Sequence, residues 1–149
     1  SIPIGTPSMS ARVFVDTNIF LYARDASERE KQPVAESALR ELWRTQSGRI
    51  SVQVLNEYFV NVTRKLDPGL APEEAWEDIE ALKAWEPLPV DFALLERART
   101  IQSLYDLSWW DSLIVAAADA LSCESILSED LSATQLYSGI RVGNPFIPR

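Results

Sequence analysis

Short β-branched or aromatic stretches alternate along this chain with longer segments of helical periodicity, and this alternation limits the possible folds more than any other feature. Parallel neighbouring strands need a crossover connection, which is usually a helix, whereas antiparallel strands do not. The pattern therefore predicts an α/β fold: a three-layer domain with a central, mainly parallel sheet flanked by helices. We expect its strands at residues 12–15, 49–52, 88–90, 125–127 and 140–142.

The helical spacing of apolar residues predicts that the segments between these strands form helices. One helix should begin after Asp16, and a second at Ser27, because Glu30 lies three residues later in the pattern of a capping box. Pro72 followed by acidic residues predicts another helix start. The segment 109–121 is apolar on nearly every side, so we expect that helix to be buried. Further helices are expected at residues 54–66 and 91–104.

A chain of 149 residues is long enough for one domain with a sizeable core. We interpret residues 1–8 as a remnant of the expression vector and residues 9–149 as a single domain, because Met9 is the only methionine and the residues before it are small and irregular. The single cysteine, Cys123, fits a reducing compartment, and no apolar run approaches the length of a membrane span. We therefore expect a cytoplasmic protein that does not enter a membrane.

The chain contains no histidine, which removes the commonest general base and the commonest metal ligand from its chemistry. With only one cysteine, it also cannot build a structural zinc site from cysteine and histidine ligands. Catalysis would have to rely on carboxylates, hydroxyls, lysines or a hard metal held by oxygen atoms. The net charge of -8 argues against binding nucleic acid through a broad basic surface, but it is compatible with a nuclease that gathers acids around Mg2+ or Mn2+.

A few acids stand at positions where they could serve such chemistry. Asp16 and Asp130 each follow an apolar strand, and ligands of parallel sheets bind beyond the carboxyl ends of the strands. The local pattern leaves an ordinary role open for both, as a helix cap or a turn residue. Asp111 has capping-box spacing from Ser108, yet it opens a helix expected to be buried, so its carboxylate must find partners or lie at a cleft. Glu57 falls away from the apolar stripe of its helix, and the pattern predicts a solvated side chain.

The segments FVDTNIFLYARD, VLNEYFVNV, SWWDSLIVAAA and ILSED occur in this order along the chain. In their order and separations they resemble the PIN-domain ribonucleases, and specifically the VapC-type toxins of toxin–antitoxin systems, over residues 11–145. The resemblance implies that Asp16, Glu57 and Asp111 hold metal ions. It also implies Asp130 as the last acid of the site.

The same resemblance implies supporting roles for Asn18, the polar neighbour of the first acid, and for Ser128, the small hydroxyl residue of the last motif. The activity it implies is that of an endoribonuclease that uses Mg2+ or Mn2+ and cuts RNA to leave 5'-phosphate and 3'-hydroxyl ends. The implied partners are an RNA substrate, an antitoxin whose C-terminal segment covers the acidic crevice, and a second copy of the chain in a homodimer.

Some features leave alternatives open. Glu129 stands beside Asp130, so the sequence does not decide which of the two carboxylates reaches the site. The pair Trp109 and Trp110 is bulky, and we interpret it as part of the core rather than as a platform on which bases stack. One alternative function is a non-catalytic PIN-like binding module whose acids merely cap helices. Another is a phosphatase of the haloacid-dehalogenase type, although Asn18 stands where that class has its second acid.

Overall fold

The computed structural model describes residues 11–147. The segment 1–8, interpreted above as a vector remnant, lies outside the described residues. Within residues 11–147, no helix has the length and apolar character needed to cross a membrane.

The centre of the fold is a parallel sheet of four strands in the order β2-β1-β3-β4. Its strands are β1 (Val13–Val15), β2 (Gly48–Arg49), β3 (Ser125–Leu127) and β4 (Arg141–Gly143). Strand β1 pairs with β2 on one side and with β3 on the other, and β3 pairs with β4. Because every pairing is parallel, all the strands end at the same edge of the sheet. The expected α/β fold with a parallel central sheet is confirmed.

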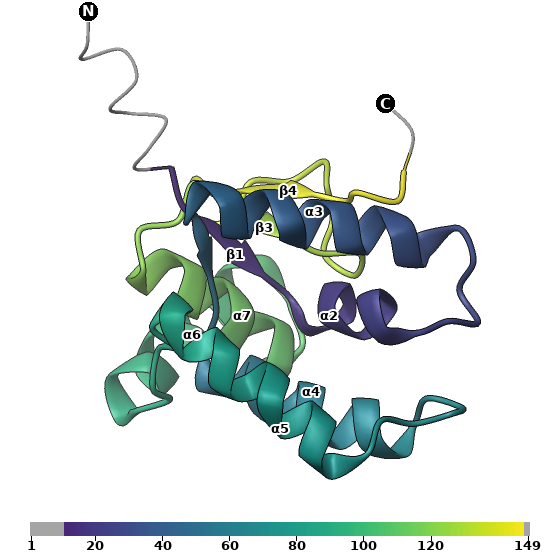
Figure 1. Ribbon diagram of the computed structural model, residues 1–149. Helices are drawn as coiled ribbons and strands as arrows, with labels where there is room; N and C mark the ends of the chain where they lie inside the picture. The colour runs from purple at the N-terminus through teal and green to yellow at the C-terminus, as the bar shows by residue number, and fades with distance from the viewer. Residues whose placement is uncertain (1–10, 148–149) are drawn as a thin grey trace, which may run out of the picture.

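Helices lie on both sides of these strands, with α3 on one side and α4 to α7 gathered on the other (Figure 1). The most apolar segment of the sequence forms α7, and its residues from Ser112 to Ala118 are buried, as expected. The helices are α2 (Thr17–Arg24), α3 (Lys31–Thr45), α4 (Val52–Arg64), α5 (Pro72–Ala81), the short 3-10 helix η2 (Leu82–Trp85), α6 (Phe92–Tyr105) and α7 (Trp109–Ala120).

The predicted start of the second helix was wrong. Helix α3 begins at Lys31, after Glu30, which makes no side-chain capping hydrogen bond. Ser27 instead donates its backbone N–H and its hydroxyl to Oδ1 of Asp25, at 3.0 and 2.5 Å. Asp and Ser side chains often form hydrogen bonds with nearby backbone groups in turns. Because Ser27 donates to Asp25 in such a turn, it does not cap the following helix.

The prediction of a strand at residues 88–90 was also wrong. Only Leu88 forms a bridge, with Ser51. Pro87 and Pro89 flank it and have no N–H to donate, so the segment cannot continue a ladder. The strand expected at 49–52 ends early for a different reason: the Ser51 hydroxyl accepts a hydrogen bond from Val54 N and caps α4.

Candidate active site

Asp16 lies at the carboxyl end of β1, where the chain turns directly into α2. Its backbone N–H donates to Leu127 O at 3.0 Å, which fixes it against the end of β3. Oδ1 accepts from Thr17 N at 2.7 Å, and Oδ2 accepts from the Ser128 hydroxyl at 2.7 Å. The side chain is only 6% exposed. Asp16 therefore caps α2, which is the ordinary role left open by its sequence position, but one of its carboxylate oxygens also accepts a hydrogen bond from Ser128, the residue directly after β3.

Burial raises the pKa of Asp16 from its ordinary value of 3.8 to about 6. The hydrogen bonds from Ser128 and Thr17 lower the pKa, while the negative charges of Asp130 and Asp111 raise it. A buried carboxylate that is also repelled by neighbouring acids is one that a cation would stabilise.

Asp111 lies in the first turn of α7, and its backbone N–H donates to the Ser108 hydroxyl at 3.1 Å. The capping serine predicted from the sequence is therefore present. The Asp111 side chain is partly buried, and burial raises its pKa; Ser108 opposes this shift, and the charges of Asp130 and Glu57 add to it. Its carboxylate thus lies within electrostatic reach of acids from two other segments of the chain.

Glu57 comes from α4, and its side chain is partly buried rather than solvated as its helical position predicted. Oε1 accepts from the Thr17 hydroxyl at 2.7 Å. Oε2 accepts from Gln53 Nε2 at 3.4 Å. The periodicity argument was wrong here because the hydrophilic side of α4 faces the start of α2, and these two helices pack together.

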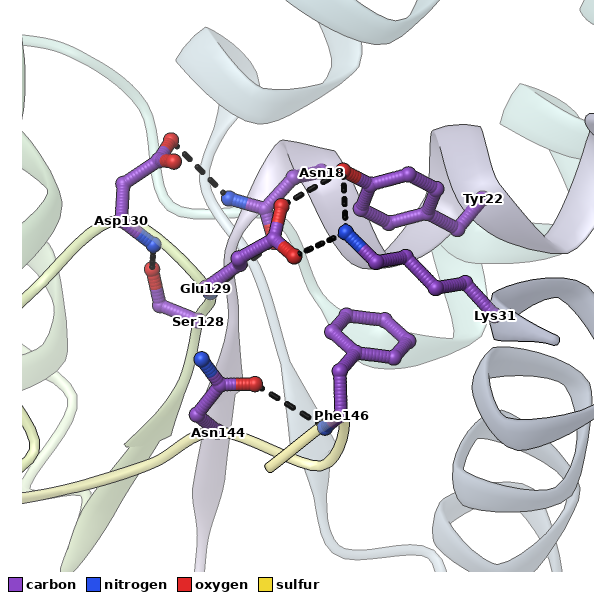
Figure 2. A network of polar contacts seen from close by, with 8 residues as sticks. All are labelled: Asn18, Tyr22, Lys31, Ser128, Glu129, Asp130, Asn144 and Phe146. Atoms are coloured by element: carbon purple, nitrogen blue, oxygen red, sulfur yellow. Dashed lines mark hydrogen bonds and ion pairs between the residues drawn. The ribbon is translucent and has the colours of Figure 1, made fainter. Parts of the chain in front are cut away.

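The choice between Glu129 and Asp130 is decided by a cation on α3. Lys31 Nζ lies 2.5 Å from Glu129 Oε2, and the Tyr22 hydroxyl donates to Glu129 Oε1 at 2.5 Å. Figure 2 shows Glu129 turned toward Tyr22 and Lys31, while Asp130 is turned toward Asn18. Burial raises the pKa of Glu129, but the hydrogen bonds from Lys31 and Tyr22 outweigh it and the pKa is lowered overall. Glu129 therefore stays ionised, and its negative charge is balanced by Lys31 outside the hollow.

Asn18 joins the acids from the two strand ends. Its Nδ2 donates to Asp130 Oδ2 at 3.2 Å and to Asp16 Oδ2 at 3.4 Å. Its Oδ1 accepts the backbone N–H of Glu129 at 3.2 Å, so both ends of the amide are used. Ser128 has a similar double role, since its hydroxyl donates to Asp16 and accepts from Asp130 N at 3.1 Å. Asp130 itself is exposed.

The acids line one hollow of about 230 Å³ at the carboxyl edge of the sheet. No lysine or arginine of residues 11–147 lines it, so the negative charge gathered there is not balanced by a neighbouring side chain. Its lining residues are Asp16, Thr17, Asn18, Leu21, Gln53, Glu57, Asn61, Trp110, Asp111, Ile114 and Asp130.

Carboxylate and amide oxygens are the donors that hard divalent ions prefer, so the chemistry of this set fits Mg2+ or Mn2+. In the described part of the chain, however, no three acids are grouped closely enough to hold one ion between them. Burial is the main cause of the raised pKa values of Asp16 and Asp111, and repulsion from the neighbouring acids adds to it. The hollow therefore contains oxygen donors of the kind that hard divalent ions prefer, but they are spaced too widely to hold one ion between three of them.

Sequence reasoning missed some residues of this site. Thr17 and Gln53 hold Glu57, and Trp110 lines the hollow although we expected it in the core. Trp110 is 61% exposed, whereas Trp109 is half-buried against the core. Of these three residues, only Thr17 had a local signal in the sequence, which is its position directly after the first acid. The others depend on how α4 and α7 lie beside the end of β1.

The sequence profile of the family described as PIN domain matches residues 13–137. A comparison with curated proteins found no match. Among solved structures, a toxin-antitoxin complex from Klebsiella pneumoniae is similar, with a TM-score of 0.63 over 91% of this chain and 98% of that chain. At 19% sequence identity, this likeness shows the fold. Since the family profile spans most of the sequence and includes Asp16, Glu57, Asp111 and Asp130, this chain belongs to the PIN domain family.

Proposed function

We propose that this protein is a divalent-metal-dependent endoribonuclease that hydrolyses RNA phosphodiester bonds. The observation that carries the proposal is the shared hollow at the carboxyl edge of the sheet, which is lined by acids from the end of β1, from α4, from α7 and from the turn after β3. Two of these acids, Asp16 and Asp111, have pKa values raised in part by the charges of the others. Membership of a family whose members are generally nucleases supports the same assignment.

In this proposal Asp16 and Asp111 are the principal metal ligands, and Glu57 and Asp130 complete the set directly or through water. Bound Mg2+ or Mn2+ would neutralise phosphate charge and would lower the pKa of the attacking water, so that it gives up its proton more readily as it attacks. The protein's own contribution is orientation. The hydrogen bonds from Thr17 N and the Ser128 hydroxyl fix the carboxylate of Asp16, and the Thr17 hydroxyl fixes that of Glu57.

Asn18 supports the site from the other side. By donating to both Asp16 and Asp130 it holds two like charges at the ends of neighbouring strands. Ser128 ties the same two residues together through its hydroxyl. We therefore assign Asn18 and Ser128 as positioning residues. In this role, loss of either should weaken metal binding without removing a ligand.

We further propose that the nuclease is the toxin of a type II toxin–antitoxin pair, of the VapC type, acting in the cytoplasm. The similar Klebsiella pneumoniae structure is a toxin-antitoxin complex, and its fold covers most of both chains. A cognate antitoxin would then be the protein partner, and a second copy of the chain would form a homodimer. Co-expression with the product of a neighbouring small gene, followed by purification of one tagged partner, tests this assignment.

The test of the nuclease proposal is cleavage of total RNA by purified protein with Mg2+, with Mn2+ and with EDTA. Asp16→Asn keeps the shape of the side chain and should abolish cleavage. Glu80→Gln, at an exposed acid of α5, is the matched control and should retain it. Metal-dependent cleavage that needs Asp16 supports the proposal, and sequencing the fragment ends identifies the cleaved bond. Full cleavage by Asp16→Asn would contradict it.

The alternatives give different results in the same preparation. A non-catalytic PIN-like binding module would cleave no RNA, and its melting temperature would not rise with Mn2+. A selective toxin that finds no substrate in the mixture would still be stabilised by Mn2+, because an ion that binds only the folded state raises the melting temperature. The haloacid-dehalogenase-type phosphatase gains no support from the PIN-domain match, and it would release phosphate from a small phosphomonoester.

A further inference from the structure

A second hollow, of about 490 Å³, lies beside the acidic one. Both are lined by Gln53, Glu57, Asn61 and Trp110, so the two form one continuous depression. The second hollow differs from the first in chemistry: it combines apolar side chains with carboxamides. Its other lining residues are Asn56, Val60, Val90 and Leu113.

Trp110 is the largest side chain at the junction of the two hollows, and it is 61% exposed. It lies beside Asp111 in the first turn of α7, whose residues from 112 to 118 are buried. Unlike an isolated surface tryptophan, this indole borders a hollow, where it offers a large apolar face to an occupant. Its flat face and N–H suit a planar, hydrogen-bonding partner.

Gln53 supplies an independent observation. The residue is 6% exposed and lines both hollows. Its Nε2 donates to Glu57 Oε2 at 3.4 Å and to the Trp110 backbone O at 3.3 Å, and both partners are acceptors, so the orientation of the amide is fixed. Its Oε1 is buried and has no hydrogen-bond partner among the described residues. An unsatisfied buried acceptor is costly, and a small movement of the Gln53 side chain toward the hollow would let a donor of a ligand satisfy it.

We propose that the second hollow binds a nucleobase of the RNA, from a nucleotide next to the cleaved phosphate. The base would stack on Trp110, and its N–H or amino edge would reach the carboxamides of Gln53, Asn56 and Asn61. The inference rests on the proposed ribonuclease function and deepens it, because it assigns a base-recognition site to the same depression. An unpartnered acceptor and two further carboxamides beside an indole fit a base edge better than they fit an aliphatic side chain of a protein.

The first experiment measures binding in EDTA, so that no metal-dependent cleavage occurs. The probes are fluorescein-labelled single-stranded oligoribonucleotides that contain each fragment end found in the cleavage assay. Trp110→Ala should weaken binding by roughly 10- to 100-fold, the range expected when one base loses its aromatic platform. The matched control is Trp76→Ala, which removes a tryptophan of similar exposure, 54%, from α5 and should leave binding unchanged.

Trp110→Ala should fold normally because the side chain is mostly exposed and because Gln53 binds the backbone oxygen, which the substitution keeps. A thermal melt checks this. If the variant does not fold, Trp110→Phe replaces it. Because phenylalanine keeps a smaller aromatic ring, this variant should weaken oligonucleotide binding less than alanine would. The oligonucleotide should also largely cease to quench the tryptophan emission of the protein.

The second experiment finds the base. A set of oligoribonucleotides with one abasic site at each position in turn is titrated against the wild type and Trp110→Ala. We expect one position, next to the cleaved bond, at which loss of the base weakens binding to the wild type but not to the variant. Equal losses for both proteins at every position would overturn the inference while leaving the nuclease proposal intact.

Failure of the underlying function gives a different pattern. If the wild type neither cleaves RNA nor binds any oligonucleotide, and Mn2+ does not raise its melting temperature, the nuclease proposal fails and the base-site inference is rejected with it. If Trp110→Ala instead loses binding to the antitoxin but keeps its affinity for RNA, the hollow receives a protein side chain, and the base site is likewise rejected.

Discussion

The Ser128 hydroxyl donates to Asp16 Oδ2 at 2.7 Å, and this contact joins residues 112 positions apart in the sequence. It ties the end of β3 to the end of β1, which are neighbours in the sheet. Ser128 is fully buried, and its hydroxyl also accepts the backbone N–H of Asp130. A single buried hydroxyl therefore contacts two of the acids and adds to the hydrogen bonds that Asn18 makes with the same two residues.

Ser128→Ala should lower both stability and activity. Leaving a buried carboxylate without one of its donors costs about 1 to 3 kcal/mol, which denaturant unfolding measures. The Ser128 hydrogen bond lowers the pKa of Asp16, so its loss should raise that pKa and move the acidic limb of the pH–rate profile to higher pH. Ser132→Ala, at an exposed serine of the next loop, is the control and should change neither. An unchanged pH profile for Ser128→Ala would contradict this role.

The contribution of Asp16 to the stability of the metal-free protein should fall as the pH rises from about 4 to about 6. The folded-state pKa of Asp16 is about 6 against an ordinary value of 3.8, so the folded state binds more protons than the unfolded state within this window. The stability is therefore fully present below the unfolded pKa and is lost as the pH rises through the folded pKa. The shift corresponds to about 3 kcal/mol. Asp16→Asn should remove this pH dependence.

The measurement is chemical unfolding in EDTA at a series of pH values for the wild type and Asp16→Asn. Subtracting the two curves isolates Asp16 from the other titrating groups. A difference that stays constant between pH 4 and pH 7 would show that Asp16 is not a shifted carboxylate.

Glu129 and Asp130 should respond differently to neutral substitutions. Asp130→Asn should reduce cleavage, by about 10-fold or more, because it removes an acid that faces Asp16 and Asn18. Glu129→Gln should change cleavage little, because Lys31 and Tyr22 already hold its carboxylate. Rates measured at saturating Mn2+ compare the two variants directly. The reverse order of effects would mean that Glu129 turns into the hollow in the active protein.

Thr17→Val should weaken metal binding by about 10- to 100-fold, as loss of a group that orients a metal ligand commonly does. The hydroxyl of Thr17 donates to Glu57 at 2.7 Å, and valine has the same shape without this donor. Thr17→Ser keeps the hydroxyl and is the matched control. The Mn2+ concentration that gives half-maximal cleavage reports the effect. If Thr17→Val needs no more Mn2+ than the wild type, Glu57 does not require Thr17 for its position.

Much of the fold followed from local sequence. The apolar stretch at β1, the buried periodicity of α7 and the capping serine Ser108 are properties of neighbouring residues, and the structure has them where they were expected. Local reasoning was wrong where two local rules competed, as at Ser27, where the Asp25 turn took the capping residue. It was also wrong at residues 88–90, where the flanking prolines remove ladder donors.

The sequence by itself determined which acids exist and which of them follow strands. Through the resemblance of the ordered motifs, it also indicated which four acids belong to the candidate site. It did not determine that they meet. Thr17 and Glu57 are 40 positions apart, and Asn18 and Asp130 are 112 apart, so only the pairing of β1 with β3 and the packing of α2 on α4 bring them to one hollow. Tertiary structure also decided that Lys31 neutralises Glu129 and that Trp110 is exposed. A helical period or a strand end gives the direction of a side chain relative to its own element, whereas its partners depend on where the other elements are placed.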